Sequence, residues 1–343
     1  MKKKNIKRLL ICISVVVVLA ITSALYVRNI FYGQALDKEI VVKITESTTY
    51  AELERIIRPA LRSGIHRKAF DYSAKRVNLK TKFRKGYYTF GKNESVVSIV
   101  RTLVNGDRHS TNLIIGEART LPQLAEKLST QLKATSTDLL DVMRNEQMRK
   151  ELGYVKDSTI AMFIPNTYQV FSNITPEDLL RRISRENSRF WNEERTSKLE
   201  RCKLSKYEVM TLASIVYEET KCVEEMPRVA GVYINRLRKK MRLQADPTVK
   251  YAVGDFTIKR VLKSHTEYDS PFNTYKYAGL PPAPICIPSI EAIDAVLNYE
   301  KHSYIYFCAS PKFDGSHLFA RTLNEHNSNA AKYRKALDRL GIK

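Results

Sequence analysis

The chain has 343 residues, a length that fits two domains in the usual size range. Apolar residues make up 43% and charged residues 27%, which is the composition of a globular protein and excludes a mainly disordered chain. The 58 basic residues outnumber the 36 acidic ones by 22. We therefore expect a polyanionic neighbour: nucleic acid, an anionic membrane surface or an acidic cell-envelope polymer.

The N-terminus narrows that choice, because a basic leader precedes an uncharged run of 19 residues, Leu9 to Val27. A helix needs about 20 residues to cross the hydrocarbon core of a bilayer. We expect residues 1–8 to be a cytoplasmic leader, 9–27 a transmembrane helix, and the rest of the chain to lie outside the cytoplasm. The alternative is a cleaved signal peptide, with Thr22–Ala24 as a weak small-x-small site.

The part beyond Arg28 keeps 52 basic and 36 acidic residues, a net charge of +16. This surplus lies outside the cytoplasm in either case, so nucleic acid is not an expected partner. The sequence therefore predicts a single-pass membrane protein whose main domains lie on the extracytoplasmic side.

Residues 28–39 have the appearance of a linker, and a small strand–helix–helix–strand unit is expected over 40–106. Its elements are a strand at 40–44, a helix capped by Thr48 or Thr49 with Pro59 inside it, a basic helix near 66–77, a strand at 86–90 and a helix near 95–104.

A mixed, mostly helical domain is expected over 107–343, which makes the fold class α+β. The expected elements are a strand at 113–117, helices near 121–132, 137–147, 176–193, 206–221 and 227–239, a strand at 303–310 and a basic C-terminal helix. Residues 162–171 (MFIPNTYQVF) are predicted as a loop, whose aromatic residues line a groove on one interpretation and pack in a turn on the other.

Cysteine and histidine give no metal signature. Four cysteines beyond the membrane run allow three disulfide pairings, and buried free thiols are the alternative: Cys202, Cys222, Cys286 and Cys308. His317 and His326 lack a third ligand at a recognisable spacing, so we interpret them as hydrogen-bonding groups in a polar cleft. No metal and no cofactor are expected.

The helix YEVMTLASIVYEETK holds the sharpest catalytic candidate. Successive residues of a helix turn by about 100°, so Glu219, seven residues after Leu212, continues the apolar stripe of Val209, Leu212 and Val216. A carboxyl on an apolar face should have a raised pKa, as a general acid at neutral pH requires. Glu218 lies about a quarter-turn away, toward a polar flank with Thr211. The alternative is a pair of solvated or ion-paired acids at a helix end.

Six blocks in one order resemble the YceG-like (MltG) endolytic murein transglycosylases: LASIVYEET (212–220), RVAGVYINRL (228–237), MRLQADPTVKY (241–251), SPFNTYKYAGLPPAPI (270–285), YIYFCAS (304–310) and HLFARTLNEHN (317–327). The N-terminal pattern is similar too, with one membrane span and a unit resembling a LysM-like fold. Two positions depart from the family: Tyr217, where a glutamate is frequent, and Asn166, where an aspartate is usual.

The resemblance implies a lytic transglycosylase that cleaves peptidoglycan glycan strands between N-acetylmuramic acid and N-acetylglucosamine and leaves 1,6-anhydromuramic ends. It implies Glu219 as the catalytic acid and a role in wall assembly as a terminator of nascent strands. Its implied partners are glycan strands, the membrane and penicillin-binding synthases. We expect the cleft to be lined by Gln244, Asp246, Asn273, Thr274 and Tyr275. The alternative function is a non-catalytic peptidoglycan-binding scaffold of the wall-synthesis machinery.

Overall fold

The structure, a computed structural model, describes residues 2–107, 109–154 and 158–339. The chain divides into two compact units. The first contains residues 1–112, 130–134 and 169–176, and the second contains 113–129, 135–168 and 177–343. Helices and separate small sheets alternate along the chain, so the fold is α+β, as predicted from the sequence.

The first unit is a strand–helix–helix–strand arrangement with additional helices. Its elements are α1 (Lys2–Tyr32), β1 (Ile40–Ile44), α2 (Tyr50–Ala60), α3 (Gly64–Arg76), α4 (Leu79–Lys82), β2 (Gly86–Phe90) and α5 (Val96–Asn105). β1 and β2 pair antiparallel, with Val42 opposite Tyr88. Thr49 caps α2 through a capping box with Glu52, which decides between the two predicted caps.

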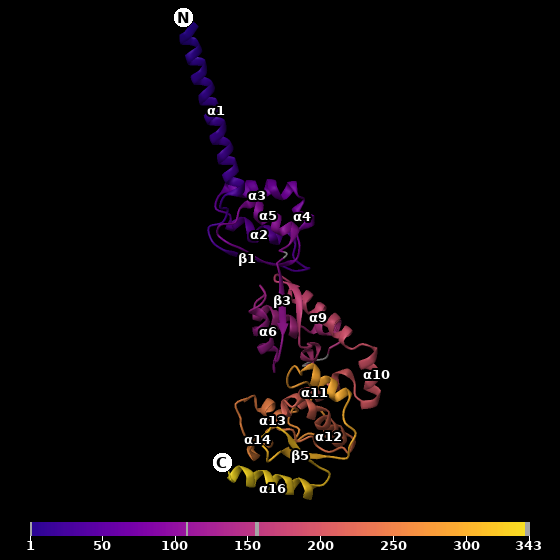
Figure 1. The fold of residues 1–343 in the computed structure, drawn as a ribbon. Helices are drawn as coiled ribbons and strands as arrows, with labels where there is room; N and C mark the ends of the chain where they lie inside the picture. Colours follow the sequence, from indigo (N-terminus) through magenta and orange to yellow (C-terminus); the bar gives the residue numbers. More distant parts are fainter. Residues whose placement is uncertain (1, 108, 155–157, 340–343) are drawn as a thin grey trace. The chain divides into compact units, whose positions relative to one another are not determined.

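The predicted linker differs from the structure. α1 is one continuous helix up to Tyr32, and Ile6–Tyr32 is long and apolar enough to cross a membrane (Figure 1). Ala35 and Leu36, which follow it, are fully buried in the core of the first unit. Leu36 also forms a β-bridge with Leu61. The expectation of a linker at 28–39 is therefore wrong, because apolar side chains in this segment pack into the unit it was expected to precede.

The loop predicted at 162–171 also differs, since most of it is a strand. β4 (Asn166–Phe171) pairs with β3 (Ser110–Ile115). Tyr168 is buried and its hydroxyl donates a hydrogen bond of 2.8 Å to the carbonyl of Ile164. Of the two interpretations of this segment, a groove lined by aromatic residues or a packed turn, Tyr168 fits the packed one.

The second unit is mostly helical. Its further elements are α6 (Leu121–Ser129), α7 (Ser136–Arg144), α8 (Glu146–Glu151), η1 (Thr159–Met162), α9 (Pro176–Phe190), α10 (Glu193–Cys202), α11 (Lys206–Glu219), η2 (Val223–Glu225), α12 (Met226–Arg238), α13 (Asp246–Val253), α14 (Lys263–Thr266), α15 (Ile290–Leu297), β5 (Tyr306–Ala309), β6 (His317–Ala320) and α16 (Leu323–Arg339). β5 and β6 form an antiparallel hairpin in which Cys308 pairs with Leu318.

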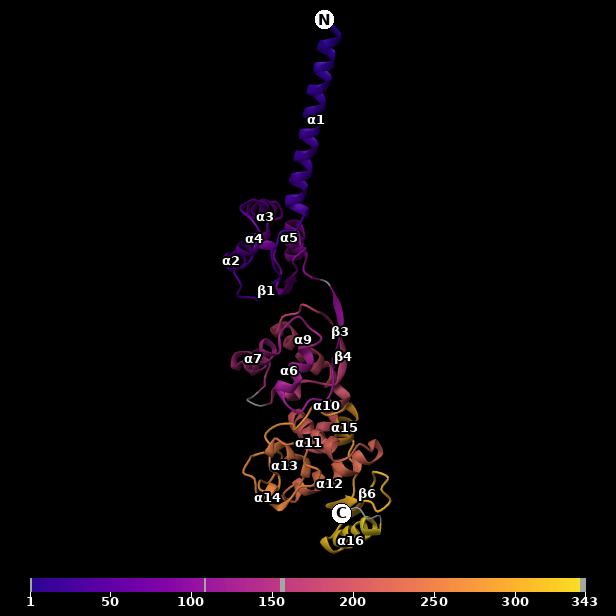
Figure 2. The ribbon, with the colours of Figure 1, turned by 90° about the vertical axis from the view of Figure 1, so that its left-hand side faces the viewer.

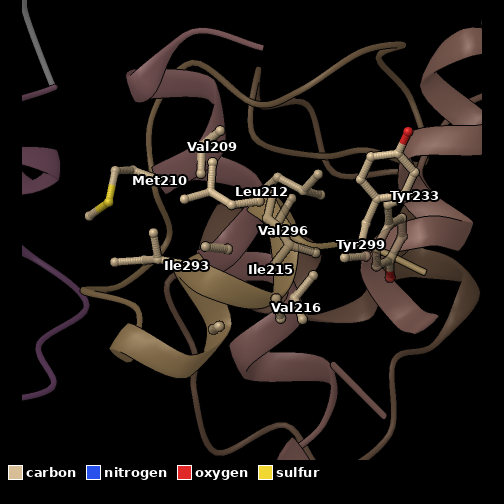
Figure 3. Close-up of a cluster of buried hydrophobic side chains, with 14 of the residues drawn as sticks. Val209, Met210, Leu212, Ile215, Val216, Tyr233, Ile293, Val296 and Tyr299 are labelled. Atoms are coloured by element: carbon tan, nitrogen blue, oxygen red, sulfur yellow. The ribbon is translucent and has the colours of Figure 1, made fainter. Parts of the chain in front are cut away.

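The core of the second unit is built around α11. This helix packs against α12, α13 and α15 (Figure 2). Every residue from Val209 to Val216 is buried, so the helix has no solvent-facing side over these two turns. Figure 3 shows Leu212 and Val216 of α11 among Ile293 and Val296 of α15, with Tyr233 of α12 at the edge of the cluster. A helix held on all sides fixes the position of the residue at its end, which is Glu219.

Candidate active site

Glu219 opens onto a cavity of about 430 Å³ in the second unit. The walls come from the end of α11, from α12, from the segment before α13, from the β5–β6 hairpin and from α16. The lining residues are Glu219, Tyr233, Arg236, Leu243, Gln244, Asp246, Tyr275, Tyr306, Phe307, Cys308, Ala309, His317, Leu323 and His326. Aromatic rings and hydrogen-bonding groups thus surround the carboxyls of Glu219 and Asp246, which suits a polar ligand with flat faces.

The surroundings of the Glu219 carboxyl raise its pKa into the neutral range. The carboxyl accepts a hydrogen bond of 2.6 Å from the Tyr233 hydroxyl at Oε1. Burial of the carboxyl raises the pKa of Glu219 to about 7; the Tyr233 hydrogen bond acts against this rise, and the negative charge of Asp246 adds to it. At neutral pH the protonated and ionised forms are therefore both well populated, as a group that gives and retakes a proton requires.

Tyr233 is a fixed donor to that carboxyl. Its side chain is buried, and its ring meets the ring of Phe307 edge to face at 5.8 Å between centroids. Burial, together with the neighbouring Glu219, raises the pKa of Tyr233 well above its usual value. The hydroxyl therefore keeps its proton over the physiological range and orients Glu219 Oε1.

Glu218 does not lie on a solvated polar flank, so that part of the sequence interpretation is wrong. Thr211, which was to mark the flank, is fully buried. The Glu218 side chain is only 15% exposed, and its Oε2 accepts a hydrogen bond of 2.9 Å from Arg119 Nη2. Glu218 is an ion-paired neighbour of the site and does not line the cavity with Glu219.

Three of the five residues expected in the cleft line this cavity together with Glu219: Gln244, Asp246 and Tyr275. The Tyr275 hydroxyl donates a 2.6 Å hydrogen bond to Asp246 Oδ1. Gln244 has a φ of +51°, a left-handed conformation that is uncommon outside glycine. The Gln244 Oε1 accepts a hydrogen bond of 3.3 Å from Arg236 Nη1, and this contact stabilises the strained conformation of Gln244.

Asn273 and Thr274 are buried, and protein groups use their polar atoms. Asn273 Nδ2 donates to the carbonyls of Thr266 and Tyr268 at 3.1 and 2.7 Å. The Thr274 hydroxyl accepts from the backbone N–H of Ala245 at 3.0 Å. Neither residue is among those that line the cavity. Asn273 and Thr274 therefore do not fit the expected role in sugar binding. Their hydrogen bonds instead stabilise the segments that carry Gln244 and Tyr275.

Sequence reasoning missed Tyr233 and Arg236 as site residues. Both lie on α12, three residues apart and therefore on one helical face. The Arg236 guanidinium is buried and donates to backbone carbonyls, including Leu243 O at 2.8 Å. The sequence does place a tyrosine and an arginine on one face of the helix that follows Glu219. The same pattern is also typical of a structural helix whose apolar stripe has basic neighbours, so it did not identify a site.

Both predicted histidines reach the cavity. His317 Nδ1 lies 2.8 Å from Glu225 Oε2, and the His317 backbone N–H donates to the same carboxylate at 3.0 Å. Because an ionised carboxylate can only accept, Nδ1 is the donor in this contact, and the contact fixes the orientation of the ring. The His326 ring stacks on Tyr306 at 5.3 Å between centroids.

All five cysteines have free thiols, so none of the three possible pairings is formed. Over the ranges that the structure describes, no three His, Cys, Asp or Glu side chains gather as a metal site would require.

The site thus combines a carboxyl of raised pKa with a fixed tyrosine donor in an aromatic cavity, an arrangement that can give and retake a proton. The model of the YceG-like family matches residues 42–332. The chain belongs to the YceG-like family.

Relatives and a solved structure agree with this assignment. An endolytic murein transglycosylase of Bacillus subtilis (strain 168) is 31% identical over 282 residues, covering 78% of this chain and 77% of that protein. The endolytic murein transglycosylase of Streptococcus pneumoniae serotype 2 is 27% identical over 333 residues, covering 86% of this chain and 58% of the longer relative. The crystal structure of a YceG-like protein from Listeria monocytogenes has a TM-score of 0.56 and 27% identity, covering 85% of this chain and 99% of that one. The chain is an enzyme of the transglycosylase class.

Proposed function

We propose that the chain is an endolytic peptidoglycan lytic transglycosylase that cleaves glycan strands between N-acetylmuramic acid and N-acetylglucosamine. The observation that carries this proposal is the Glu219 carboxyl, with its pKa raised to about 7, on the wall of an aromatic cavity. The names of the relatives, which are endolytic murein transglycosylases, support the same substrate.

The reaction needs one group that gives and then retakes a proton. Protonated Glu219 donates its proton to the glycosidic oxygen, and the bond from that oxygen to the anomeric carbon of the muramic sugar breaks toward the oxygen. The C6 hydroxyl of the same sugar then attacks the anomeric carbon, with assistance from the substrate's N-acetyl group. The ionised Glu219 takes the hydroxyl proton. No water is consumed, and the product carries a 1,6-anhydro ring.

The neighbours of Glu219 set its proton affinity and hold the sugar. Tyr233 donates to the carboxyl and stabilises the ionised form, while the charge of Asp246 favours the protonated form. Gln244, Asp246 and Tyr275 are our candidates for sugar contacts, because their polar groups line the same cavity. A planar tyrosine ring suits the apolar face of a hexose.

The N-terminal part serves as an anchor in this proposal. Residues 9–27 span the membrane, 1–8 stay in the cytoplasm, and the catalytic domain acts on the periplasmic or extracytoplasmic side. The strand–helix–helix–strand unit, with its two paired strands and α2 and α3 between them, is compatible with a LysM-like glycan-binding role. An anchored enzyme of this kind would terminate nascent strands beside penicillin-binding synthases.

The alternative function is a non-catalytic peptidoglycan-binding scaffold, and digestion of purified peptidoglycan by the full-length chain separates the two. Mass spectrometry of the soluble fragments should find 1,6-anhydromuramic ends in the sample with the parent chain. Binding without any new ends would favour the scaffold. New reducing ends would indicate hydrolysis, for which Asp246 is the second carboxylate already present in the cavity.

A further inference from the structure

The second unit holds another cavity, of about 660 Å³, which shares no lining residue with the catalytic cavity. It lies between the start of α6, the α7–α8 segment, η1, α13 and the segment after α14. Its lining residues are Thr120, Leu121, Pro122, Met143, Arg144, Arg149, Thr159, Ile160, Tyr251 and Phe272. Nothing in the reaction described above uses this cavity.

Its lining is positively charged. Two arginines line it, exposed Arg144 and half-buried Arg149, and none of the described lining residues is acidic. Arg149 Nε is a buried donor without a hydrogen-bond partner among the described residues, which is costly for a polar group. The nearest acids on α8 are engaged elsewhere: Glu146 pairs with Lys150 at 2.7 Å and Glu151 with Arg181 at 2.8 Å. An anion in the cavity would supply the missing partner.

The rest of the lining is apolar and aromatic. The rings of Tyr251 and Phe272 lie 4.7 Å apart between centroids, beside Leu121, Pro122 and Ile160. A bare inorganic anion would leave these surfaces uncovered. The combination suits a ligand that carries a carboxylate on a chain with apolar side groups, which is the chemistry of an acidic peptide.

Two segments carry residues of both cavities. Asp246 in the catalytic cavity and Tyr251 in the second cavity are both on α13, five residues apart, which is about 7.5 Å along the helix axis and about 140° around it. Phe272 and Tyr275 are three residues apart and line different cavities. An extended peptide of four residues spans about 13 Å, which is longer than the axial offset of the two α13 residues.

We propose that the second cavity binds the carboxylate-bearing stem peptide that the muramic sugar of the substrate carries, with Arg144 and Arg149 as the anion partners. The proposal rests on the proposed function, because the peptide arrives attached to the cleaved strand. An enzyme that uses this cavity would bind glycan strands with stem peptides more tightly than strands from which the peptides have been removed.

The test compares uncrosslinked strands with intact stem peptides and the same strands stripped of peptide by an amidase. The full-length Arg144→Ala/Arg149→Ala variant should show a KM about 10-fold higher on peptide-bearing strands and an unchanged KM on stripped strands. Arg144→Lys/Arg149→Lys should recover part of the loss. Arg260→Ala, an exposed arginine that lines neither cavity, is the matched control. Equal effects of the double variant on both substrates, or none, would overturn the proposal.

A binding measurement separates this proposal from the proposed function. Titration of the full-length Glu219→Gln variant with synthetic stem tetrapeptide, followed by calorimetry, should give saturable binding that Arg144→Ala/Arg149→Ala abolishes. This readout needs no turnover. Saturable binding of a phosphate polymer in place of the peptide, or no binding of the peptide, would contradict the assignment even if the parent cleaves strands.

Discussion

Glu219 is a carboxyl whose folded-state pKa lies above its unfolded value, about 7 against 4.5. Between these pH values the folded chain binds more protons than the unfolded chain, so its stability falls as the pH rises through this window. Glu219→Gln removes the group that titrates. We expect the variant to be more stable than the parent by about 3 kcal/mol at pH 8, with no difference below pH 4.5.

Thermal or denaturant unfolding of both detergent-solubilised proteins across pH 4–9 measures this difference. Asp255→Asn is a suitable control, because hydrogen bonds from Thr257 hold the pKa of Asp255 below its usual value and it is fully exposed. A Glu219→Gln difference that does not change with pH would mean that the carboxyl titrates in the ordinary range.

Tyr233 acts on the same carboxyl and gives a second prediction. Its hydrogen bond favours ionised Glu219, so Tyr233→Phe should raise the pKa of Glu219 further and move the alkaline limb of the activity profile to higher pH. Turnover should fall about 10-fold at the optimum, because the carboxyl loses its orienting donor. The pH dependence of strand cleavage measures both. If Tyr233→Phe lowers the rate but does not shift the alkaline limb of the activity profile, Tyr233 contributes packing alone and does not set the pKa of Glu219.

The sequence could predict that Glu219 lies on the apolar stripe of its helix, because this position depends on helical geometry within one element. Tyr233 and Arg236 could not be predicted, because their roles depend on how α12 meets α11 and the segment after it. The amide of Asn273 has the right chemistry for a sugar contact. In the structure it donates hydrogen bonds to the carbonyls of Thr266 and Tyr268, and this loop geometry could not be predicted from the sequence.

The helix α11 is the element that carries Glu219, the proposed catalytic group. It begins with a capping box, in which the Ser205 hydroxyl accepts from Glu208 N–H at 3.2 Å and Glu208 Oε2 accepts from Ser205 N–H at 2.8 Å. It ends at Glu219, where the carbonyl end of the helix dipole further disfavours a negative charge. Helix termini therefore define both the position and the proton affinity of the site.

Loss of the α11 cap should destabilise the second unit. Ser205→Ala leaves the Glu208 N–H without its acceptor and should lower the free energy of unfolding by about 1 kcal/mol. Ser197→Ala is the matched control, since the Ser197 hydroxyl is exposed and donates to a carbonyl within α10. Denaturant unfolding monitored by circular dichroism measures both variants. Equal effects of the two changes would mean that the capping box contributes nothing specific.

The long helices and the strands β1 and β2 were predictable, whereas the strands β4 and β6 were not. The spacing of apolar residues placed α11, α12 and the strands β1 and β2 within a few residues. β4 lies in a segment that was expected as a loop (162–171), and β6 was not among the expected elements. Both strands depend on a partner, β3 and β5, that local sequence does not specify.

For the whole molecule, the basic leader and the apolar α1 predict a retained single span. We expect N-terminal sequencing of the membrane-extracted protein to begin within residues 1–8, because the uncharged run continues without a good cleavage site. Added protease should digest the chain beyond residue 29 in spheroplasts and spare the leader. A soluble product with a mature N-terminus near residue 25 would contradict the anchor.

If Glu219 gives and retakes the proton in strand cleavage, its substitution should stop the formation of anhydro ends. Mass spectrometry of digested glycan strands should count 1,6-anhydromuramic ends formed per unit time by the parent, Glu219→Gln and Glu218→Gln chains. Glutamine keeps the size of the side chain but cannot transfer a proton, so Glu219→Gln should lose about 10²-fold or more in turnover while its fold stays intact. Glu218→Gln should cost far less, because Glu218 pairs with Arg119 and lines neither cavity. Anhydro ends formed by Glu219→Gln at near the parent rate would contradict the account.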